Sequence, residues 1–373
     1  MKKILLVSCD GLGNGGVQAV MMSIVRELHH EYHFDIVLFT DEERRYDGEF
    51  LSYGGSIFRI PRYNGSNGFH KKIDYYIRGK HVHDELKKLL KEHGPYEAIH
   101  CHDEYENGPI LKAAFEEKVP IRIAHTHIIN NKSNIVAEFL EGSRRKAIQK
   151  YATAKIGCSR EACNAYYSCP DEALVVNNPI NEKRFNKKGF QSERKNSLSL
   201  VQIGSYNPTK NQLFSIAVIN EIVSKHKDAH LYLVGFQMGD YVTKIEAAIK
   251  DNGLTENVTL LPGDYDTPRL LNESSYLIMP SHKEGFGIVL IEAQAMGVKC
   301  FASEGIPRTT DCGGVKYLSL QAGPSAWADE IIKDYIITGG EHYNYNIDKF
   351  STVEIMDVYR RLYEGNLVCG LVL

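Results

Sequence analysis

Short apolar segments alternate with longer segments of helical spacing along this chain, and the alternation starts again near the middle. The first apolar segment, residues 3–8, is followed by a glycine-rich turn and then by apolar residues at the 3.6-residue spacing of a helix. Strands that alternate with helices form parallel sheets that are covered on both faces. The chain is therefore predicted to be an α/β protein with two parallel-sheet domains.

The expected elements fall into two groups on either side of Asn177-Asn178-Pro179, which is a connector because proline breaks regular structure. Strands are expected at residues 3–8, 34–40, 56–60, 98–101, 121–125, 154–158, 198–203, 230–235, 258–261, 276–279 and 299–302. Helices are expected at residues 71–92, 108–118, 212–225, 242–252 and 289–296. We therefore expect domains at residues 1–178 and 179–350, and a final helix and tail at 351–373 that crosses back to the N-terminal domain.

Length and composition restrict the class of protein. A chain of 373 residues exceeds what one hydrophobic core usually supports, which agrees with two domains. The net charge of −3 gives no reason to expect nucleic acid as a partner. The apolar run at the N-terminus is too short for a signal peptide, and no stretch approaches the length of a membrane span. We expect a cytoplasmic protein whose eight cysteines are free thiols.

The densest signal for chemistry is a glycine-rich loop between an expected strand and an expected helix. Gly285 and Gly287 have no Cβ and let the backbone approach a ligand closely. The amides of residues 286–289 lie at a helix N-terminus, where anions are stabilised. Glu284 and Glu292 stand eight positions apart, and carboxylates are good acceptors for sugar hydroxyls. Taken singly, the two glutamates fit structural roles, one as an acid in the first turn of a helix and the other as a buried acid with a partner.

This loop and the helix after it resemble the donor-binding motif of retaining glycosyltransferase family four, which has the GT-B fold. That motif is a Glu-Gly-Phe-Gly run with a second Glu eight positions on and then Ala-x-Ala-x-Gly, which ends here at Gly297. In the family, the residue matching Glu284 contacts the transferred sugar, and the one matching Glu292 holds the ribose of the nucleotide. The resemblance assigns contacts with the sugar and phosphates to Phe286, Gly287, Ile288 and Val289.

A second loop with donor-site character follows the strand expected at residues 198–203. Gly204 permits a close approach, and Lys210 supplies a point charge suited to a phosphate, although a lone lysine is often a solvated surface residue. The family shows Gly-Arg and then Lys a few residues on, and both cations neutralise the diphosphate. Lys210 matches that lysine, whereas Ser205 and Tyr206 stand where the arginine is expected. Charge stabilisation at the leaving group is then expected from Lys210 and the helix terminus, or from an arginine elsewhere.

Histidine pairs end two of the expected strands of the first domain. Ligands bind at the carboxyl ends of parallel strands, but a structural histidine is an alternative at each position. The family places a histidine that touches the donor sugar at the end of the strand expected at 121–125; His125 matches it best and His127 second. With Glu284 and Lys210, His125 completes the expected catalytic group. The residues assigned to the acceptor side are His102, His127, Gly15 and Gly16.

Three patterns offer other interpretations. The run from Gly11 to Gly16 fits Gly-x-Gly-x-x-Gly, with Asp41 after the second strand, and taken alone it indicates a dinucleotide site. Asp264-Tyr265-Asp266 imitates a metal-binding Asp-x-Asp, and we interpret it as a coincidence. The two histidine clusters, and the cysteines at 158, 163 and 169, could be taken for metal ligands. The resemblance instead implies metal-independent chemistry with no cofactor.

The resemblance covers nearly the whole chain, and residues 122–127 are similar to bacterial capsule and exopolysaccharide enzymes of the family. It implies two Rossmann-like domains that face each other across a cleft and close over the substrates. The implied activity is transfer of a hexose-type sugar, with retention, from a nucleotide-diphosphate donor to a saccharide or lipid-linked acceptor in surface polysaccharide biosynthesis. Uridine is favoured over guanosine as the base.

Other functions stay open at this point. A nucleotide-sugar epimerase or hydrolase of GT-B fold would share the donor site, and so would a non-catalytic nucleotide-sugar-binding or partner subunit. The expected helix at residues 71–92 carries seven lysines and arginines beside apolar residues, and basic amphipathic helices rest on anionic membranes. Acidic residues are interspersed, so that a solvated surface helix is the alternative. Peripheral contact with the inner face of the membrane is therefore a further expectation.

Overall fold

The computed structural model describes residues 1–8, 11–13, 15–60, 71–102, 107–127, 135–190, 197–237 and 239–366, with the backbone alone at 71–78 and 135–141. The chain forms two compact units. Unit 1 comprises Met1–Pro179 together with Thr352–Leu373, and unit 2 comprises Ile180–Ser351. Pro179 thus ends the first unit, where the sequence placed it at the start of the second. Thr352–Leu373 are part of unit 1. They belong to the final helix and tail that were expected to cross back to the N-terminal domain.

Unit 1 is built on a seven-stranded parallel sheet of order β3-β2-β1-β4-β5-β6-β7. Its strands are β1 (Lys2–Ser8), β2 (Tyr32–Leu38), β3 (Ile57–Arg59), β4 (Ala98–Cys101), β5 (Ile121–Thr126), β6 (Ala154–Gly157) and β7 (Leu174–Val175). Its helices are α1 (Gly16–Leu28), α2 (Asp47–Ser52), α3 (Lys71–His93), α4 (Asn107–Glu116), α5 (Ile135–Tyr151), α6 (Arg160–Tyr166) and α12 (Thr352–Tyr363).

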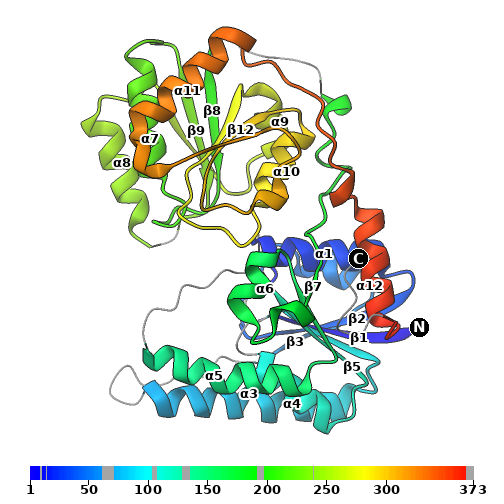
Figure 1. Ribbon diagram of the computed structural model, residues 1–373. Coiled ribbons are helices and arrows are strands. Elements are labelled where there is room, and N and C mark those ends of the chain that lie inside the picture. Colours follow the sequence, from blue (N-terminus) through cyan, green and yellow to red (C-terminus); the bar gives the residue numbers. More distant parts are fainter. Residues whose placement is uncertain are drawn as a thin grey trace. The chain divides into compact units, whose positions relative to one another are not determined.

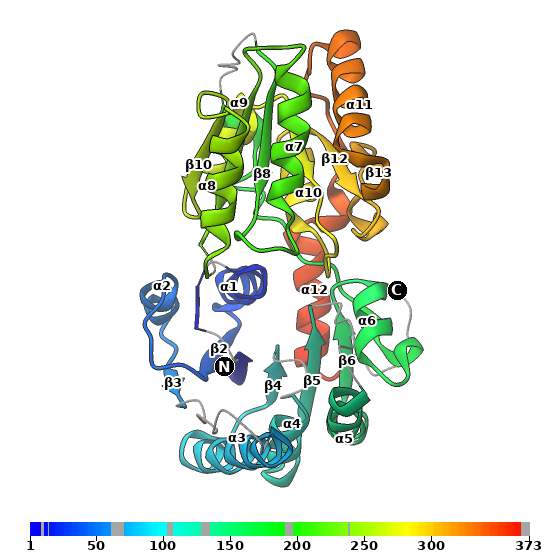
Figure 2. The same ribbon diagram turned by 90° about the vertical axis from the view of Figure 1, so that its left-hand side faces the viewer.

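The alternation of side chains along β1 explains why both faces of this sheet are covered. Ile4 and Leu6 point into a core shared with α1 and α12, whereas Leu5 and Val7 point into a core shared with α3 and α4. All four side chains are fully buried. Figures 1 and 2 show α3, α4 and α5 together on one side of the sheet. A near-continuous apolar strand is what a parallel sheet between two helical layers requires.

Unit 2 is built on a six-stranded parallel sheet of order β10-β9-β8-β11-β12-β13. Its strands are β8 (Ser199–Ile203), β9 (His230–Gly235), β10 (Val258–Pro262), β11 (Tyr276–Met279), β12 (Lys299–Ser303) and β13 (Val315–Leu318). Its helices are α7 (Gln212–Val223), α8 (Tyr241–Asp251), α9 (Thr267–Glu273), α10 (Ile288–Ala295) and α11 (Gly323–Thr338). Figure 1 shows α7, α8 and α11 on one side of the sheet and α9 and α10 on the other.

The predicted fold class is confirmed, because each unit is a parallel sheet of Rossmann type with helices on its two faces. The strands expected at 230–235 and 276–279 have those bounds, and most other expected elements differ by one or two residues at an end. Seven helices and strands of the described residues were not expected: α2, α5, α6, α9, α11, β7 and β13. Three of these helices, α2, α6 and α9, span six or seven residues, too few for a clear helical period.

The expected basic helix is present as α3. Two of its lysines form ion pairs at the C-terminal end of α4: Lys87 Nζ lies 2.7 Å from a carboxylate oxygen of Glu116, the last residue of α4, and Lys91 Nζ lies 3.7 Å from one of Glu117, the residue after it. These two lysines of α3 are therefore paired with acids of the same unit. Among the described residues, no helix is long and apolar enough to cross a bilayer. The six described cysteines are free thiols.

Helix α12 joins the end of the chain to the core of unit 1. Its buried residues recur at helical spacing and lie in the same core as α1 and β1; they are Ile355, Met356, Tyr359, Leu362 and Tyr363. Val353 on the same helix is 73% exposed. One stripe of the helix therefore completes a core whose other residues lie more than 170 positions earlier in the chain.

Replacing Met356 by Ala should lower the free energy of unfolding by about 2–5 kcal/mol, because it leaves a cavity in a fully packed core. Urea unfolding followed by circular dichroism measures the change. Val353→Ala, on the exposed side of α12, is the control and should change stability by less than about 0.5 kcal/mol. Equal effects of the two substitutions would contradict the packing of α12 described above.

Candidate functional site

Two loops of unit 2 meet because the strands that precede them are neighbours in the sheet. β8 pairs with β11 in parallel, so the loop before α7 and the loop before α10 leave the same edge. Hydrogen bonds join the loops: His282 N donates to Thr209 O at 2.8 Å, and Asn211 Nδ2 donates to Pro280 O at 3.1 Å. The two sequence motifs assigned to the donor are thereby brought together at the carboxyl edge of the sheet.

Lys210 and Glu284 form an ion pair across these loops. Lys210 Nζ lies 2.6 and 2.7 Å from the two Glu284 carboxylate oxygens. The two side chains are 26% and 11% exposed, so the pair is accessible from solvent without being fully hydrated. Gly204 lies beside the lysine stem, and a Cβ at this position would be in ordinary van der Waals contact with Lys210 Cδ, at 3.4 Å. The Ser205 carbonyl beside it accepts a 3.0 Å hydrogen bond from Gln212 Nε2.

Helix α10 begins four residues after Glu284, at Ile288. Gly287 caps it in the left-handed conformation, with φ of +87°, and no side chain caps the helix. The amides of Ile288 and Val289 belong to the first turn, where a helix supplies no acceptor of its own. No acidic residue lies in that turn. Phe286 is buried with its ring edge-on to Phe350, which fixes the loop just before these amides.

Glu292 lies inside α10 and is partly buried. Desolvation raises the pKa of this carboxyl to about 7, and the positive charge of Arg184 opposes the shift. An acid with a raised pKa at a ligand-binding edge is a candidate for function, because its charged form lacks compensation until a ligand supplies it.

Arg184 is a residue that the sequence analysis did not single out. Its exposed guanidinium donates a 3.3 Å hydrogen bond to Thr267 Oγ1 at the start of α9 and lies over the Phe185 ring. Tyr206, one of the two residues that stand where the family pattern has arginine, is buried, and its single hydroxyl proton is shared between the Leu233 and Leu261 carbonyls at 2.8 and 3.0 Å. Tyr206 is therefore part of the core, and Arg184 adds a cation near Glu292 from an irregular segment whose sequence carries no motif.

A large cavity of unit 2 lies elsewhere. It has a volume of about 980 Å³ and is lined by residues that include Lys187, Gln294, His342 and Tyr343. Gln294 is near the C-terminal end of α10, whereas the proposed donor residues lie at or before its N-terminal turns. Volume alone therefore does not identify the site, and the charged groups at the sheet edge indicate it better.

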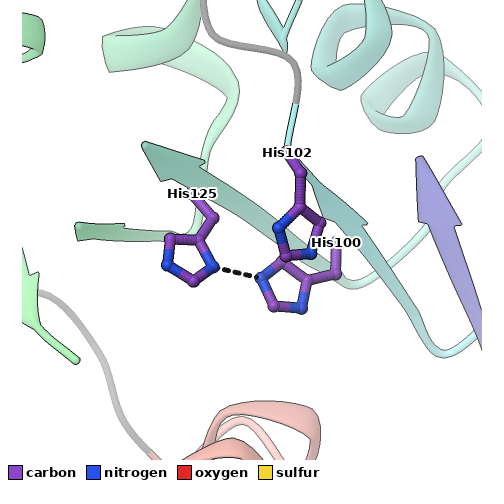
Figure 3. A group of neighbouring side chains, drawn as sticks. All are labelled: His100, His102 and His125. Atoms are coloured by element: carbon purple, nitrogen blue, oxygen red, sulfur yellow. Dashed lines mark hydrogen bonds between the residues drawn. The ribbon is translucent and has the colours of Figure 1, made fainter. Parts of the chain in front are cut away.

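In unit 1, four histidines gather at the carboxyl ends of the neighbouring strands β4 and β5. His100, His102, His125 and His127 are all buried. Figure 3 shows His100 and His125 joined by a hydrogen bond, with His102 beside them. Burial lowers the pKa of His100 and of His127 to about 3 and that of the other two well below the ordinary value, so all four imidazoles are neutral.

The same cluster contains the spacing of a small metal site. One ligand atom from each of His100, His102 and His125 lies within 4.8 Å of the others, and within the described residues this is the one group of three or more histidines, cysteines and acids so arranged. Neutral imidazoles are good metal ligands. Asp264-Tyr265-Asp266, which we interpreted as a chance match to a metal-binding Asp-x-Asp, is exposed between β10 and α9. Among the described residues it belongs to no such group.

The glycine-rich turn of unit 1 precedes α1. Gly15 caps the helix and Gly16 is its first residue. A Cβ at Gly15 would lie 2.1 Å from Gln18 Oε1, whereas one at Gly16 would meet open space. Asn14 of this motif lies outside the described residues, and Asp41 of the dinucleotide interpretation is exposed beyond β2.

Comparison with known proteins agrees with the motifs. The family model of glycosyl transferases group 1 matches residues 183–333, which contain both donor loops. EpsF of Bacillus subtilis (strain 168) is 26% identical over 349 residues, which cover 89% of this chain and 87% of EpsF. The capsular polysaccharide biosynthesis glycosyltransferase CapH of Staphylococcus aureus is 24% identical over 365 residues, or 93% of this chain and 96% of CapH.

Among solved structures, Anabaena Alr3699/HepE in complex with UDP and glucose superposes with a TM-score of 0.77. The sequence identity is 15%, and the match covers 98% of this chain and 100% of HepE. The structural likeness establishes the GT-B fold, with two Rossmann-like parallel-sheet units. Residues 183–333 match the group 1 glycosyl transferases, and the two relatives that resemble nearly the whole chain support the class of glycosyltransferases.

Proposed function

We propose that this glycosyltransferase transfers a hexose-type sugar, with retention, from a UDP-sugar to a saccharide or lipid-linked saccharide acceptor in surface polysaccharide biosynthesis. Similarity to CapH, a capsular polysaccharide biosynthesis glycosyltransferase, supports the pathway class. Similarity in fold to HepE, which was solved with UDP and glucose, supports the choice of base and sugar type. A lipid-linked acceptor would bring the enzyme to the inner face of the membrane in the cytoplasm, with the exposed basic residues of α3 as the contact.

The observation that carries this proposal is the Lys210–Glu284 ion pair beside the uncapped N-terminus of α10. A nucleotide-diphosphate sugar offers an anion to Lys210 and hydroxyl donors to Glu284, so the ligand replaces one internal contact by two external ones. Gly204 and Ser205 line the lysine's loop, and the Phe286–Val289 amides add donors at the positive end of a helix. The donor is thus held at its phosphates and at its sugar together.

Glu292 supplies the expected contact with the ribose. A carboxylate accepts hydrogen bonds from the two ribose hydroxyls only when it is ionised, and burial holds part of its population in the acid form near neutral pH. Donor binding therefore ionises Glu292. Arg184 supports the ionised form by its charge.

Charge stabilisation at the leaving group is the central step. As the bond between the sugar and the diphosphate breaks, negative charge grows on the leaving phosphate, where Lys210 and the α10 amides are already fixed. In retaining members of the family the acceptor is thought to attack from the side on which the leaving group departs, and no protein nucleophile is needed. His125 is proposed to touch the donor sugar. His102, His127, Gly15 and Gly16 are proposed to serve the acceptor side.

Two alternative functions use the same donor site. A GT-B epimerase or hydrolase would release a free sugar, and a non-catalytic partner subunit would bind the donor without turnover. Incubation of the isolated chain with UDP-glucose or UDP-galactose distinguishes them. UDP release that depends on an added saccharide acceptor supports transfer, release without an acceptor indicates hydrolysis or epimerisation, and binding without release indicates a partner subunit.

The reaction is proposed to be metal-independent, because Lys210 and helix amides occupy the role that a divalent cation plays at a diphosphate. Turnover should be unchanged by an excess of EDTA and by added magnesium or manganese. Acceptor-dependent UDP release, measured after dialysis against chelator, provides the check. A loss of activity on chelation that is restored by one metal would refute metal independence.

Replacing Lys210 by Met should lower kcat by about 10²–10³-fold, because a fixed positive group is lost where charge develops. Initial rates of UDP release over a range of donor concentrations separate kcat from KM. The matched control is Lys225→Met, which removes an exposed lysine of unit 2 whose Nζ lies 2.7 Å from Asp329. A Lys210 variant with the same kcat as the control would exclude Lys210 from catalysis.

Replacing Glu292 by Gln should remove the pH dependence of donor affinity. In the wild type, the affinity for UDP-glucose should fall about tenfold per pH unit as the pH drops below about 7, because the protonated acid must lose its proton to bind. Glu292→Gln should bind weakly and equally from about pH 5 to about pH 8. Titration calorimetry with UDP-glucose measures both, and Glu304→Gln, an exposed glutamate of the same unit, is the control.

The same substitution should stabilise the free protein at high pH. The folded-state pKa of Glu292 lies above its unfolded value, so the native state binds more protons and wild-type stability falls as the pH rises from about 4.5 to about 7. Glu292→Gln should therefore gain about 1–3 kcal/mol over the wild type at pH 8 and nothing below pH 4.5. Thermal unfolding at both pH values tests the sign, and a pH-independent difference would contradict it.

A further inference from the structure

The four buried histidines of unit 1 form two separate hydrogen-bonded pairs. His100 Nε2 lies 3.1 Å from His125 Nδ1 (Figure 3), and His102 Nδ1 lies 2.9 Å from His127 Nε2. At the other end of the first pair, His100 Nδ1 lies 2.8 Å from the hydroxyl of Tyr363 on α12. His125 Nε2 is buried and has no partner within the described chain. The contacts form a chain from Tyr363 through His100 to His125, with one free end.

Proton counting restricts this chain to two states. Each neutral imidazole carries one N–H and one lone pair, so every hydrogen bond in the chain runs in the same direction. If Tyr363 donates to His100, then His100 donates from Nε2, and the proton of His125 is on Nε2. If Tyr363 accepts instead, His125 donates from Nδ1 and its Nε2 carries a lone pair.

The second state leaves more buried groups unsatisfied. The Tyr363 side chain is fully buried, and its hydroxyl has His100 as its one hydrogen-bond partner within the described residues. If that hydroxyl accepts, its own proton has no acceptor there and the His125 Nε2 lone pair has no donor, whereas if it donates, the Nε2–H of His125 is the one group of the three residues left without a partner. A phenol is also a stronger acid than a neutral imidazole, which favours donation from the oxygen to the nitrogen. Both arguments select the state in which Tyr363 donates.

We infer that Tyr363, acting through His100, fixes His125 in the Nε2–H tautomer, so that His125 presents a hydrogen-bond donor to an oxygen of the sugar donor. Tyr363 and His100 are then positioning residues, and His125 is a donor rather than a general base. This role rests on the proposed function of His125. The second pair has no such anchor, because His102 Nε2 and His127 Nδ1 both lack partners within the described chain, and its direction is not set by a neighbouring hydroxyl.

A neighbouring tyrosine provides a matched control. Tyr359 lies one turn before Tyr363 on α12, is equally buried, and has its ring 5.7 Å from that of His100 and 6.3 Å from that of His125. Its hydroxyl has no hydrogen-bond partner within the described residues. Tyr359→Phe therefore removes a hydroxyl from the same surroundings without breaking the chain to His125.

The direct test is the tautomer of His125 in the full chain without substrate. Long-range ¹H–¹⁵N correlation spectra distinguish a protonated from an unprotonated Nε2, and the signal that disappears in His125→Gln assigns the residue. The wild type and Tyr359→Phe should show His125 protonated on Nε2, and Tyr363→Phe should show a mixture of tautomers. A wild type protonated on Nδ1, or a Tyr363→Phe spectrum like that of the wild type, overturns the inference. Circular dichroism verifies that each variant is folded.

Activity tests the role of the tautomer separately. The side-chain amide of glutamine donates a hydrogen bond but is no base, so His125→Gln should retain at least about tenfold more kcat than His125→Ala. Tyr363→Phe should lower kcat several-fold, and Tyr359→Phe should not. If the tautomer is as inferred but His125→Ala has full activity and donor affinity, the proposed function of His125 fails while the tautomer stands.

A metal ion at the cluster is the competing explanation. The spacing of His100, His102 and His125 would suit an ion. Nitrogens that bind a metal could not also form the hydrogen bond between His100 and His125. Elemental analysis of the purified chain decides this. About one equivalent of zinc that is lost in His100→Ala would overturn the hydrogen-bonded chain, and absence of bound metal after incubation with zinc and dialysis supports it.

Discussion

The parallel arrangement of neighbouring strands is the constraint on which both sites depend. In a parallel sheet the strands end at one edge, so residues that follow adjacent strands meet even when they are distant in sequence. In unit 2 the adjacent strands β8 and β11 place Lys210 against Glu284, 74 positions later. In unit 1 the adjacent strands β4 and β5 place His100 against His125. The same topology thus produces an ion pair in one unit and a chain of neutral groups in the other.

The difference between the two sites follows from burial. The Lys210 and Glu284 side chains keep contact with water, so their ion pair is accessible to a charged or hydroxylated ligand. The histidines of unit 1 are buried at the carboxyl ends of their strands, and desolvation keeps them neutral. A neutral imidazole can orient a hydroxyl but cannot neutralise a phosphate. This difference is the physical basis for proposing that Lys210 contacts the phosphates and that His125 contacts only the sugar.

Local sequence patterns were sufficient for the fold class and for the two loops of unit 2 that the structure brings together. The strand at 276–279 is a fully buried apolar run, and the glycines before α10 mark its start. The partners that modify these groups were not predictable in this way. Tyr363 lies 263 positions from His100, and Arg184 acts on Glu292 from an irregular segment. Such contacts depend on tertiary packing, for which a single sequence provides no local signal.

The free site of unit 2 is held by interactions that a ligand can replace at small cost. A partly exposed ion pair contributes about 0–1 kcal/mol, so separating Lys210 from Glu284 requires little free energy. Lys210 then gains an anionic partner and Glu284 gains hydroxyl donors, both on the same ligand molecule. Glu292 differs from this ion pair, because desolvation makes its ionised form unfavourable until a ligand supplies hydrogen-bond donors. Binding is therefore favoured by a ligand that has an anion and hydroxyl groups at once, and a simple phosphate would satisfy Lys210 while leaving both carboxylates without donors.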